Sequence, residues 1–276
     1  MKILGSRRYV WGIVMAVIGL MLAMFPVAMA NGGEKDLPSV DEIVLKANLA
    51  SYYQGEDGRA RVHMVITDAK GRTREREFVI LRRDEKDGGD QKFYVYFNRP
   101  ADVRKMVFMV WKHIDRDDDR WLYLPALDLV KRIAASDKRT SFTGAHFFYE
   151  DVSGRSIQED VHKLIEKTDN RFVLRSVPKD PKTVEFSSFK IWIDRKTYMP
   201  MKAEYLDKRG KKYRIVEAMD VKVIQGFPTV TKSRVQDLRS GGNTVAEFSH
   251  IKYNIKLPAK VFTERYLRRA PRRWLR

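Results

Sequence analysis

The sequence predicts a mainly β (α+β) protein built on an antiparallel sheet, and three observations lead to this fold class. From residue 59 onward, short segments rich in Val, Ile, Tyr and Phe recur between turn residues, as antiparallel strands do. No long helical pattern separates these segments, which argues against a parallel α/β sheet. Two segments are apolar on both faces, so each must be covered on both sides or face a dry cavity.

The first 30 residues have the pattern of a secretory signal peptide. A basic segment ending at Arg8 precedes an apolar run at 9–25, and the small residues Ala28 and Ala30 stand two positions apart. This pattern predicts export and cleavage after Ala30. The alternative is an uncleaved anchor, because residues 9–30 are long enough to cross a bilayer, which takes about 20 residues.

One helix and a series of strands follow. Apolar residues at helical spacing, with Asp41 and Glu42 in the first turn, predict a helix over 39–53. A plausible hairpin turn, 68–71, joins the first two strands. The expected strands are 61–67, 75–81, 92–98, 104–114, 120–124, 161–166, 171–177, 185–194, 199–206, 211–223, 229–237 and 244–253.

The two-sided apolar strands lie at 93–97 and 106–111. A curved sheet with helices inside it and a lipid-sized space would cover them, and so would the centre of a β-sandwich. The least strand-like stretch is 131–156, which carries Phe142, Phe147, Phe148 and Tyr149 between small and polar residues. Such apolar loops usually cap a core or close over a ligand.

Several chemistries are excluded or disfavoured by composition. The chain has no Cys, which excludes disulfides, thiolate metal sites, thiol catalysis and lipidation of an N-terminal Cys. The five His are scattered without metal-binding spacing, and no nucleophile elbow, phosphate loop or dinucleotide motif occurs. We therefore expect no enzyme activity, no metal ion and no cofactor.

The formal net charge of +18 calls for an acidic partner. An exported protein meets anionic lipid headgroups more often than nucleic acid, so an anionic membrane surface is the expected partner and nucleic acid is not. Residues 265–276 hold six Arg and no acid, and each basic residue near such a membrane contributes about 1 kcal/mol. The basic tail, 268–276, is either a membrane contact or a frayed, solvated terminus.

Seven short motifs, taken together, resemble the outer-membrane lipoprotein-sorting proteins of the LolA-like superfamily. They are DRWLYLPAL at 119–127, KRI at 131–133, SFTG at 141–144, FYED at 148–151, IWID at 191–194, YMP at 198–200 and VFT at 261–263. The domain that resembles this superfamily is expected to span 31–267.

The resemblance implies an incomplete, strongly curved antiparallel β-barrel with helices covering a concave apolar face that accepts acyl chains. It implies a periplasmic carrier that moves a lipid or lipoprotein toward the outer membrane. Its partners would be an inner-membrane transporter, of the resistance-nodulation-division type, and an outer-membrane acceptor. The alternative is a periplasmic adaptor that is not a carrier and whose groove holds a segment of a protein partner.

Aromatic side chains are the candidates for lining the groove or its lid, with ordinary core packing as the alternative for each. They are Phe108, Trp111, Trp121, Tyr123, Phe147, Phe148 and Trp192. Lys131 and Arg132 are candidates for contacting a headgroup. Gly144 and Gly154 provide permissive backbone at the two ends of the aromatic segment, as a lid that opens would need.

Overall fold

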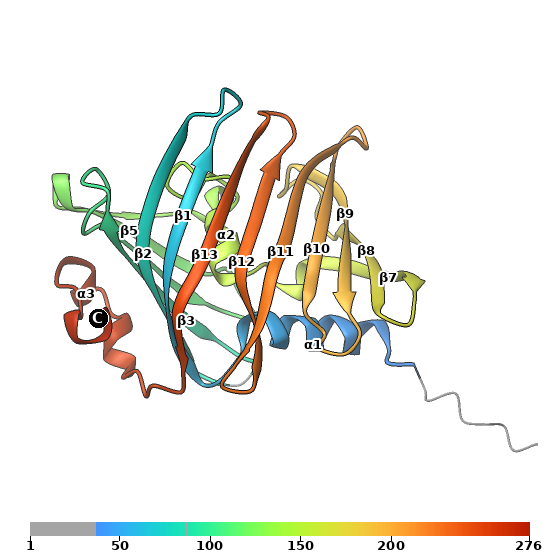
Figure 1. The fold of residues 1–276 in the computed structure, drawn as a ribbon, viewed down its shortest axis with the longest axis horizontal. Helices are drawn as coiled ribbons and strands as arrows, with labels where there is room; N and C mark the ends of the chain where they lie inside the picture. Colours follow the sequence, from blue (N-terminus) through green and yellow to red (C-terminus); the bar gives the residue numbers. More distant parts are fainter. Residues whose placement is uncertain (1–36, 87) are drawn as a thin grey trace, which may run out of the picture. The chain divides into compact units, whose positions relative to one another are not determined.

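Thirteen strands form one sheet in the order β6-β5-β4-β3-β2-β1-β13-β12-β11-β10-β9-β8-β7 (Figure 1). The computed structural model describes residues 37–86 and 88–276, of which 38–276 make up one compact unit. Neighbouring strands are antiparallel throughout, and the two end strands do not pair with each other, so the sheet stays open. The expected fold class, an incomplete curved antiparallel barrel, is confirmed. The signal peptide expected at 1–30 lies outside the described residues.

Twelve of the strands overlap those expected from the sequence. The exception is the edge strand β6, whose four residues are mostly exposed and therefore lack the apolar alternation that marks a strand. The strands are β1 (Asp57–Thr67), β2 (Thr73–Asp84), β3 (Gln91–Arg99), β4 (Val107–Lys112), β5 (Asp119–Leu124), β6 (Leu129–Arg132), β7 (Asp160–Lys167), β8 (Arg171–Pro178), β9 (Phe186–Asp194), β10 (Pro200–Asp207), β11 (Lys212–Ile224), β12 (Phe227–Asp237) and β13 (Gly242–Tyr253).

Helix α1 (Val40–Tyr52) forms where the sequence predicts a helix. Ser39 caps its start, because its side-chain oxygen accepts the backbone N–H of Glu42 at 3.1 Å. The buried face of the helix, which includes Ile43 and Ala47, packs against apolar residues of β8 and β9. Burial of this face, rather than helix propensity, holds so short a helix in place.

The end of α1 is tied to the other half of the sheet. Arg82 of β2 donates to the carbonyl oxygens of Gln54 and Gly55, each at 2.7 Å, and also to that of Tyr52. Gln91 of β3 donates to the Tyr52 carbonyl at 2.8 Å. These bonds satisfy carbonyls that a helix end leaves free, and they place a cation at the negative end of the helix dipole.

A long connection, residues 133–159, crosses the concave face and is called the strap here. It contains η2 (Ala135–Asp137), α2 (Tyr149–Ser153) and η3 (Ile157–Glu159). Because it joins β6 to β7, which lie at opposite ends of the sheet, it must span the sheet. Phe142, Ala145 and Tyr149 of the strap belong to a buried cluster that also includes side chains from the concave face of β1 to β5.

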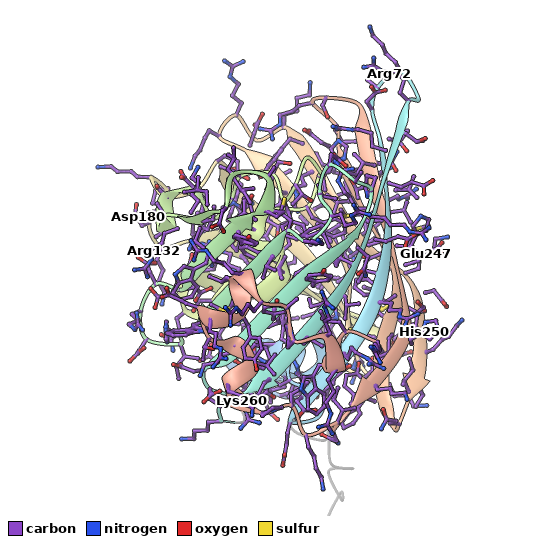
Figure 2. The ribbon with its side chains drawn as sticks, turned by 90° about the vertical axis from the view of Figure 1, so that its left-hand side faces the viewer. Arg72, Arg132, Asp180, Glu247, His250 and Lys260 are labelled. Atoms are coloured by element: carbon purple, nitrogen blue, oxygen red, sulfur yellow. The ribbon has the colours of Figure 1, made fainter. Side chains whose placement is uncertain are left out.

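The convex face of the same strands is covered by the C-terminal segment, residues 256–276. The segment contains η4 (Ala259–Phe262), α3 (Arg265–Arg268) and η5 (Arg272–Trp274). Its side chains Leu257, Val261, Phe262 and Leu267 are at most 1% exposed and pack against the convex sides of β2 to β5. Figure 2 shows this segment in front of the sheet.

The two-sided apolar strands β3 and β4 are thus covered on both faces, by the strap and by the C-terminal segment. Trp274 and Leu275 also pack, partly buried, against the convex cluster. For these two residues the frayed-terminus alternative is wrong. Among the described residues, no helix combines the length and the apolar character that a bilayer crossing requires.

Candidate ligand cavity

An apolar cavity of about 520 Å³ lies between α1, the strap and the concave face of the sheet. Its volume falls within the range of roughly 300–1,000 Å³ typical of ligand pockets. The walls are mainly aliphatic and aromatic, and they include Val62, Met64, Ile80, Leu174, Ile191 and Phe248. The cavity therefore offers an apolar ligand a largely dry site.

The concave face is filled at one end of the sheet and open at the other. Under the strap, Phe97, Phe108 and Val110 are 0% exposed. On β10 and β11, by contrast, Ala203 and Ala218 line the cavity and are only half-buried. Small side chains at these positions leave open volume beside them.

Several neutral polar groups of the wall are hydrogen-bonded within the protein. The Tyr253 hydroxyl donates to Gln54 Oε1 at 2.7 Å and lies 3.0 Å from Thr229 Oγ1. His162 lies with Nδ1 2.8 Å from Ser176 Oγ and with Nε2 3.1 Å from the Ile157 carbonyl oxygen. Groups that are already paired offer a ligand little polar anchoring.

The acidic side chains of the wall are paired with basic side chains of the protein. Arg155 Nε lies 2.8 Å from Asp160 Oδ2, and Arg155 Nη1 lies 3.3 Å from Glu150 Oε1. Asp151 binds Arg214 at 2.5 Å. These pairs neutralise one another, so the part of a ligand that lies against them should be uncharged.

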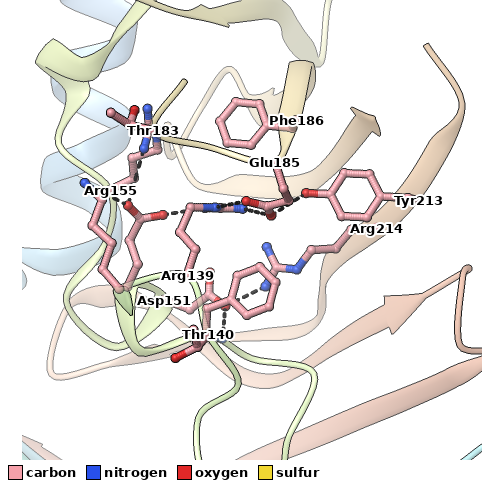
Figure 3. Close-up of polar contacts among 12 residues, drawn as sticks. Arg139, Thr140, Asp151, Arg155, Thr183, Glu185, Phe186, Tyr213 and Arg214 are labelled. Atoms are coloured by element: carbon pink, nitrogen blue, oxygen red, sulfur yellow. Dashed lines mark hydrogen bonds and ion pairs between the residues drawn. The ribbon is translucent and has the colours of Figure 1, made fainter. Parts of the chain in front are cut away.

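A buried ionic network fastens the strap to the sheet (Figure 3). Arg139 of the strap donates through Nε and Nη2 to the two carboxylate oxygens of Glu185, both at 2.8 Å, and the Tyr213 hydroxyl donates to Glu185 Oε1 at 2.6 Å. Burial acts to raise the pKa of Glu185, but these bonds and the Arg139 charge outweigh it and lower the pKa to about 2. Bidentate pairs of this kind fix geometry as well as charge.

Glu150 of α2 is the most buried carboxylate of this network, at 2% exposed. Besides Arg155, it pairs with Arg139 and, at 3.4 Å, with Lys138. Burial acts to raise the pKa of Glu150, and the three cations more than compensate, so the pKa is lowered. Glu150 therefore stays charged and paired, and these pairs hold the α2 turn of the strap in place.

The strap also passes close to α1, at Gly154. This residue has φ +79°, and a Cβ atom there would lie 2.6 Å from ring atoms of Tyr52. Lys112 of β4 contacts both segments: it donates to the Ser153 carbonyl at 2.6 Å and lies 5.1 Å from the centre of the Tyr52 ring. Burial lowers the pKa of Lys112 to about 8.

The three phenylalanines proposed for the groove and lid have different surroundings in the structure. Phe147 lines the cavity. Phe108 lies outside the lining, packed against Phe142 and Tyr149 at centroid distances of 5.5 and 5.0 Å. Phe148 packs against arginine side chains, with the Arg214 guanidinium 4.3 Å from its ring centre. Phe147 and Phe148 therefore do not cover a single opening together.

The remaining four aromatic candidates lie on the convex face. Trp111 and Trp121 form an edge-to-face pair at 4.9 Å, and Trp111 Nε1 donates to the Phe262 carbonyl at 2.8 Å. Tyr123 also packs against this convex cluster. Trp192 points away from the cavity, because its strand neighbours Ile191 and Ile193 both line it.

The two headgroup candidates, Lys131 and Arg132, lie on the edge strand β6 and are absent from the cavity wall. The Arg132 guanidinium lies 5.2 Å from the centre of the Trp121 ring, on the convex side, and pairs with Asp119. Many of the wall residues that sequence reasoning missed are small or aliphatic, such as Ala203, Val216 and Ala218. In the sequence, only the alternation of inward and outward side chains along a strand marks these residues.

An open, curved antiparallel sheet with an apolar cavity under its strap defines the LolA-like class of folds, and solved structures agree. A DUF1329 family protein from Desulfovibrio piger is 29% identical, with a TM-score of 0.74, over 82% of this chain and 96% of that one. A putative outer membrane lipoprotein-sorting protein domain from Vibrio parahaemolyticus is 26% identical, with a TM-score of 0.74, over 82% and 97%. A LolA superfamily protein from Nitrosomonas europaea shares the fold at 19% identity, with a TM-score of 0.65, over 83% and 100%.

Residues 89–269 match the model of the DUF1329-like family, whose description reads "Uncharacterized protein". The chain belongs to this family, and it shares its fold with a LolA superfamily protein. None of the curated proteins matches it.

Proposed function

We propose that this protein is a periplasmic carrier that binds acyl chains of a lipid or lipoprotein in the cavity. The supporting observation is an apolar cavity of about 520 Å³ whose acidic wall residues are paired with basic side chains. Burial of about ten methylenes would contribute about 8 kcal/mol before the cost of association, at about 0.8 kcal/mol each. That is enough to retain an acyl chain while leaving its headgroup in solvent.

The proposed mechanism is binding and release, without a covalent step. An acyl chain leaves an apolar site readily only when a second site offers equal burial, because crossing water would expose each methylene. Loading from an inner-membrane transporter of the resistance-nodulation-division type and delivery to an outer-membrane acceptor would meet this condition. The name of the Vibrio parahaemolyticus relative supports transport toward the outer membrane, and the signal-peptide pattern supports export.

The test is native mass spectrometry of the exported protein, followed by extraction and identification of the bound molecules. The account predicts a bound mass that organic solvent removes and that is identified as a lipid or an acylated peptide. An unacylated peptide recovered in its place would favour the adaptor that holds a partner's segment. Protein without any acylated ligand, after purification from membrane-containing cells, would contradict the carrier.

A further inference from the structure

The outer side of the C-terminal segment is a strongly basic surface. Eight cationic residues of this segment are exposed, against one acid, Glu264. They are Lys256, Lys260, Arg265, Arg268, Arg269, Arg272, Arg273 and Arg276. Figure 2 faces this side of the molecule and labels Lys260. Clustered like charges repel one another, so their gathering here does not serve the stability of the fold.

The apolar residues of the segment hold this surface in a fixed orientation. Leu257, Phe262 and Leu267 are buried against the sheet, so the intervening basic residues face outward. The Tyr94 hydroxyl donates to the Tyr266 carbonyl at 2.8 Å, and Arg83 Nη1 donates to the Leu257 carbonyl at 2.7 Å. The cations are therefore presented by an ordered surface.

Two exposed leucines border the basic surface. Leu127 is 70% exposed and Leu129 is 46% exposed, at the turn between β5 and β6. Asp128, between them, binds Arg268 with Oδ1 3.0 Å from Nε, which joins this turn to α3. This is the one ion pair between a C-terminal-segment side chain and a carboxylate among the described residues. The other cations of the segment are left without an acidic partner.

We propose that this surface, formed by the C-terminal segment and the 127–129 turn, docks on an anionic lipid bilayer. Arginine guanidinium groups match phosphate oxygens in bidentate geometry, and exposed leucines can enter the boundary between headgroups and acyl chains. The leucines favour a bilayer over a wholly polar polyanion. The inference names a partner for the proposed carrier, but it rests on the convex surface and would hold without a cargo in the cavity.

The test is co-sedimentation of the full exported chain with vesicles of phosphatidylcholine alone and with one third phosphatidylglycerol. Binding is expected only to the anionic vesicles. It should weaken as salt rises from about 0.1 M to about 1 M, because the Debye length falls from about 10 Å to about 3 Å. A single-stranded oligonucleotide serves as the competing polyanion. Preference for the oligonucleotide, or equal binding to both kinds of vesicle, would overturn the proposal.

Two triple variants with the same charge change separate this surface from net charge. The first is Arg269→Glu, Arg272→Glu and Arg273→Glu. The matched control is Lys163→Glu, Arg175→Glu and Lys190→Glu, three exposed residues that face one another across β7, β8 and β9. Because each basic residue contributes about fivefold to membrane partitioning, the first variant should lose at least about 100-fold. Equal losses in both would show that only net charge matters.

A third variant tests the apolar part without changing charge. Leu127→Ser with Leu129→Ser should weaken vesicle binding several-fold while leaving its salt dependence intact. Unchanged binding would limit the surface to a charge contact and contradict docking into the headgroup boundary. Lipid carried by the purified variants should stay at the level of the unmodified protein, so a failure here is distinguishable from a failure of the carrier hypothesis.

Discussion

Phe147 and Phe148 are adjacent in the chain, yet their side chains have different surroundings. Phe147 lines the cavity, whereas the ring of Phe148 packs against Arg214 at 4.3 Å and Arg139 at 5.0 Å. The backbone at Phe148 is extended, with φ −102° and ψ 163°, and this directs neighbouring side chains to opposite sides. One residue therefore faces the proposed ligand, and the next secures the strap.

Single substitutions at these two positions should have different effects. Phe147→Ser should leave the fold largely intact and speed the loss of bound acyl chains, because it removes apolar surface from the cavity wall. Phe148→Ser should lower the free energy of unfolding by about 2 kcal/mol, through loss of desolvated cation–π contacts. Thermal unfolding and the rate of transfer of a fluorescent fatty acid to vesicles measure the two effects. Equal release rates for Phe147→Ser and the unmodified protein would remove Phe147 from the ligand site.

The contact between Gly154 and Tyr52 makes a second prediction. Gly154→Ala should be destabilising by more than about 2 kcal/mol, because it adds a clash at 2.6 Å to the strain of a positive φ. Gly210→Ala is the matched control, since Gly210 has φ +77° and a Cβ there would meet nothing within 4 Å. Chemical denaturation of both variants isolates the strap contact. Equal destabilisation would show that backbone strain alone is responsible.

Acid should weaken the attachment of the strap through Glu185. The pKa of this carboxyl is about 2 in the folded protein against an ordinary value of 4.5, so its pairing stabilises the fold fully above pH 4.5. That stability should be lost as the pH falls from about 4.5 to about 2. Glu185→Gln should flatten the decline of the melting temperature in this window, whereas Glu166→Gln, which removes an exposed carboxylate, should not. An unchanged decline in Glu185→Gln would contradict the role given to this pair.

Lys112 should make stability depend on pH in an alkaline window. The pKa of Lys112 is about 8 in the folded protein against an ordinary value of 10.5, so the unfolded chain binds more protons between these values. Stability should therefore rise as the pH increases from about 8 to about 10.5. Lys112→Met should abolish this rise, and Lys190→Met, at an exposed position, should keep it. A rise that persists in Lys112→Met would show that another group causes it.

The sequence predicts the fold better than the site, for a physical reason. Period-two alternation and the capped apolar face of α1 are local properties, so the helix and twelve strands could be located from them. Alternation does not say which face of a strand is concave. Trp111 and Trp121 were therefore as good candidates as Phe147, and only the packing of the C-terminal segment shows that they lie on the convex side.

Two features depend on contacts between distant residues and could not be predicted. The cavity is lined by small residues such as Ala203 and Ala218, on β10 and β11, which leave space in the wall. In a sequence, an alanine in a strand does not indicate whether a cavity lies beside it. The network around Glu150 joins the strap to Glu185, and in the sequence these charges look like any others on a charged chain.

Filling the cavity is the most direct test of whether it holds acyl chains. Ala203→Trp and Ala218→Trp each add a large side chain to the wall, while Ala101→Trp adds the same side chain at an exposed turn. The measurement is the amount of acyl chain that co-purifies with each folded variant, determined by native mass spectrometry. The account predicts that both wall variants lose most of the bound lipid and that Ala101→Trp retains the amount found with the unmodified protein. Lipid retained in full by both folded wall variants would contradict binding in this cavity.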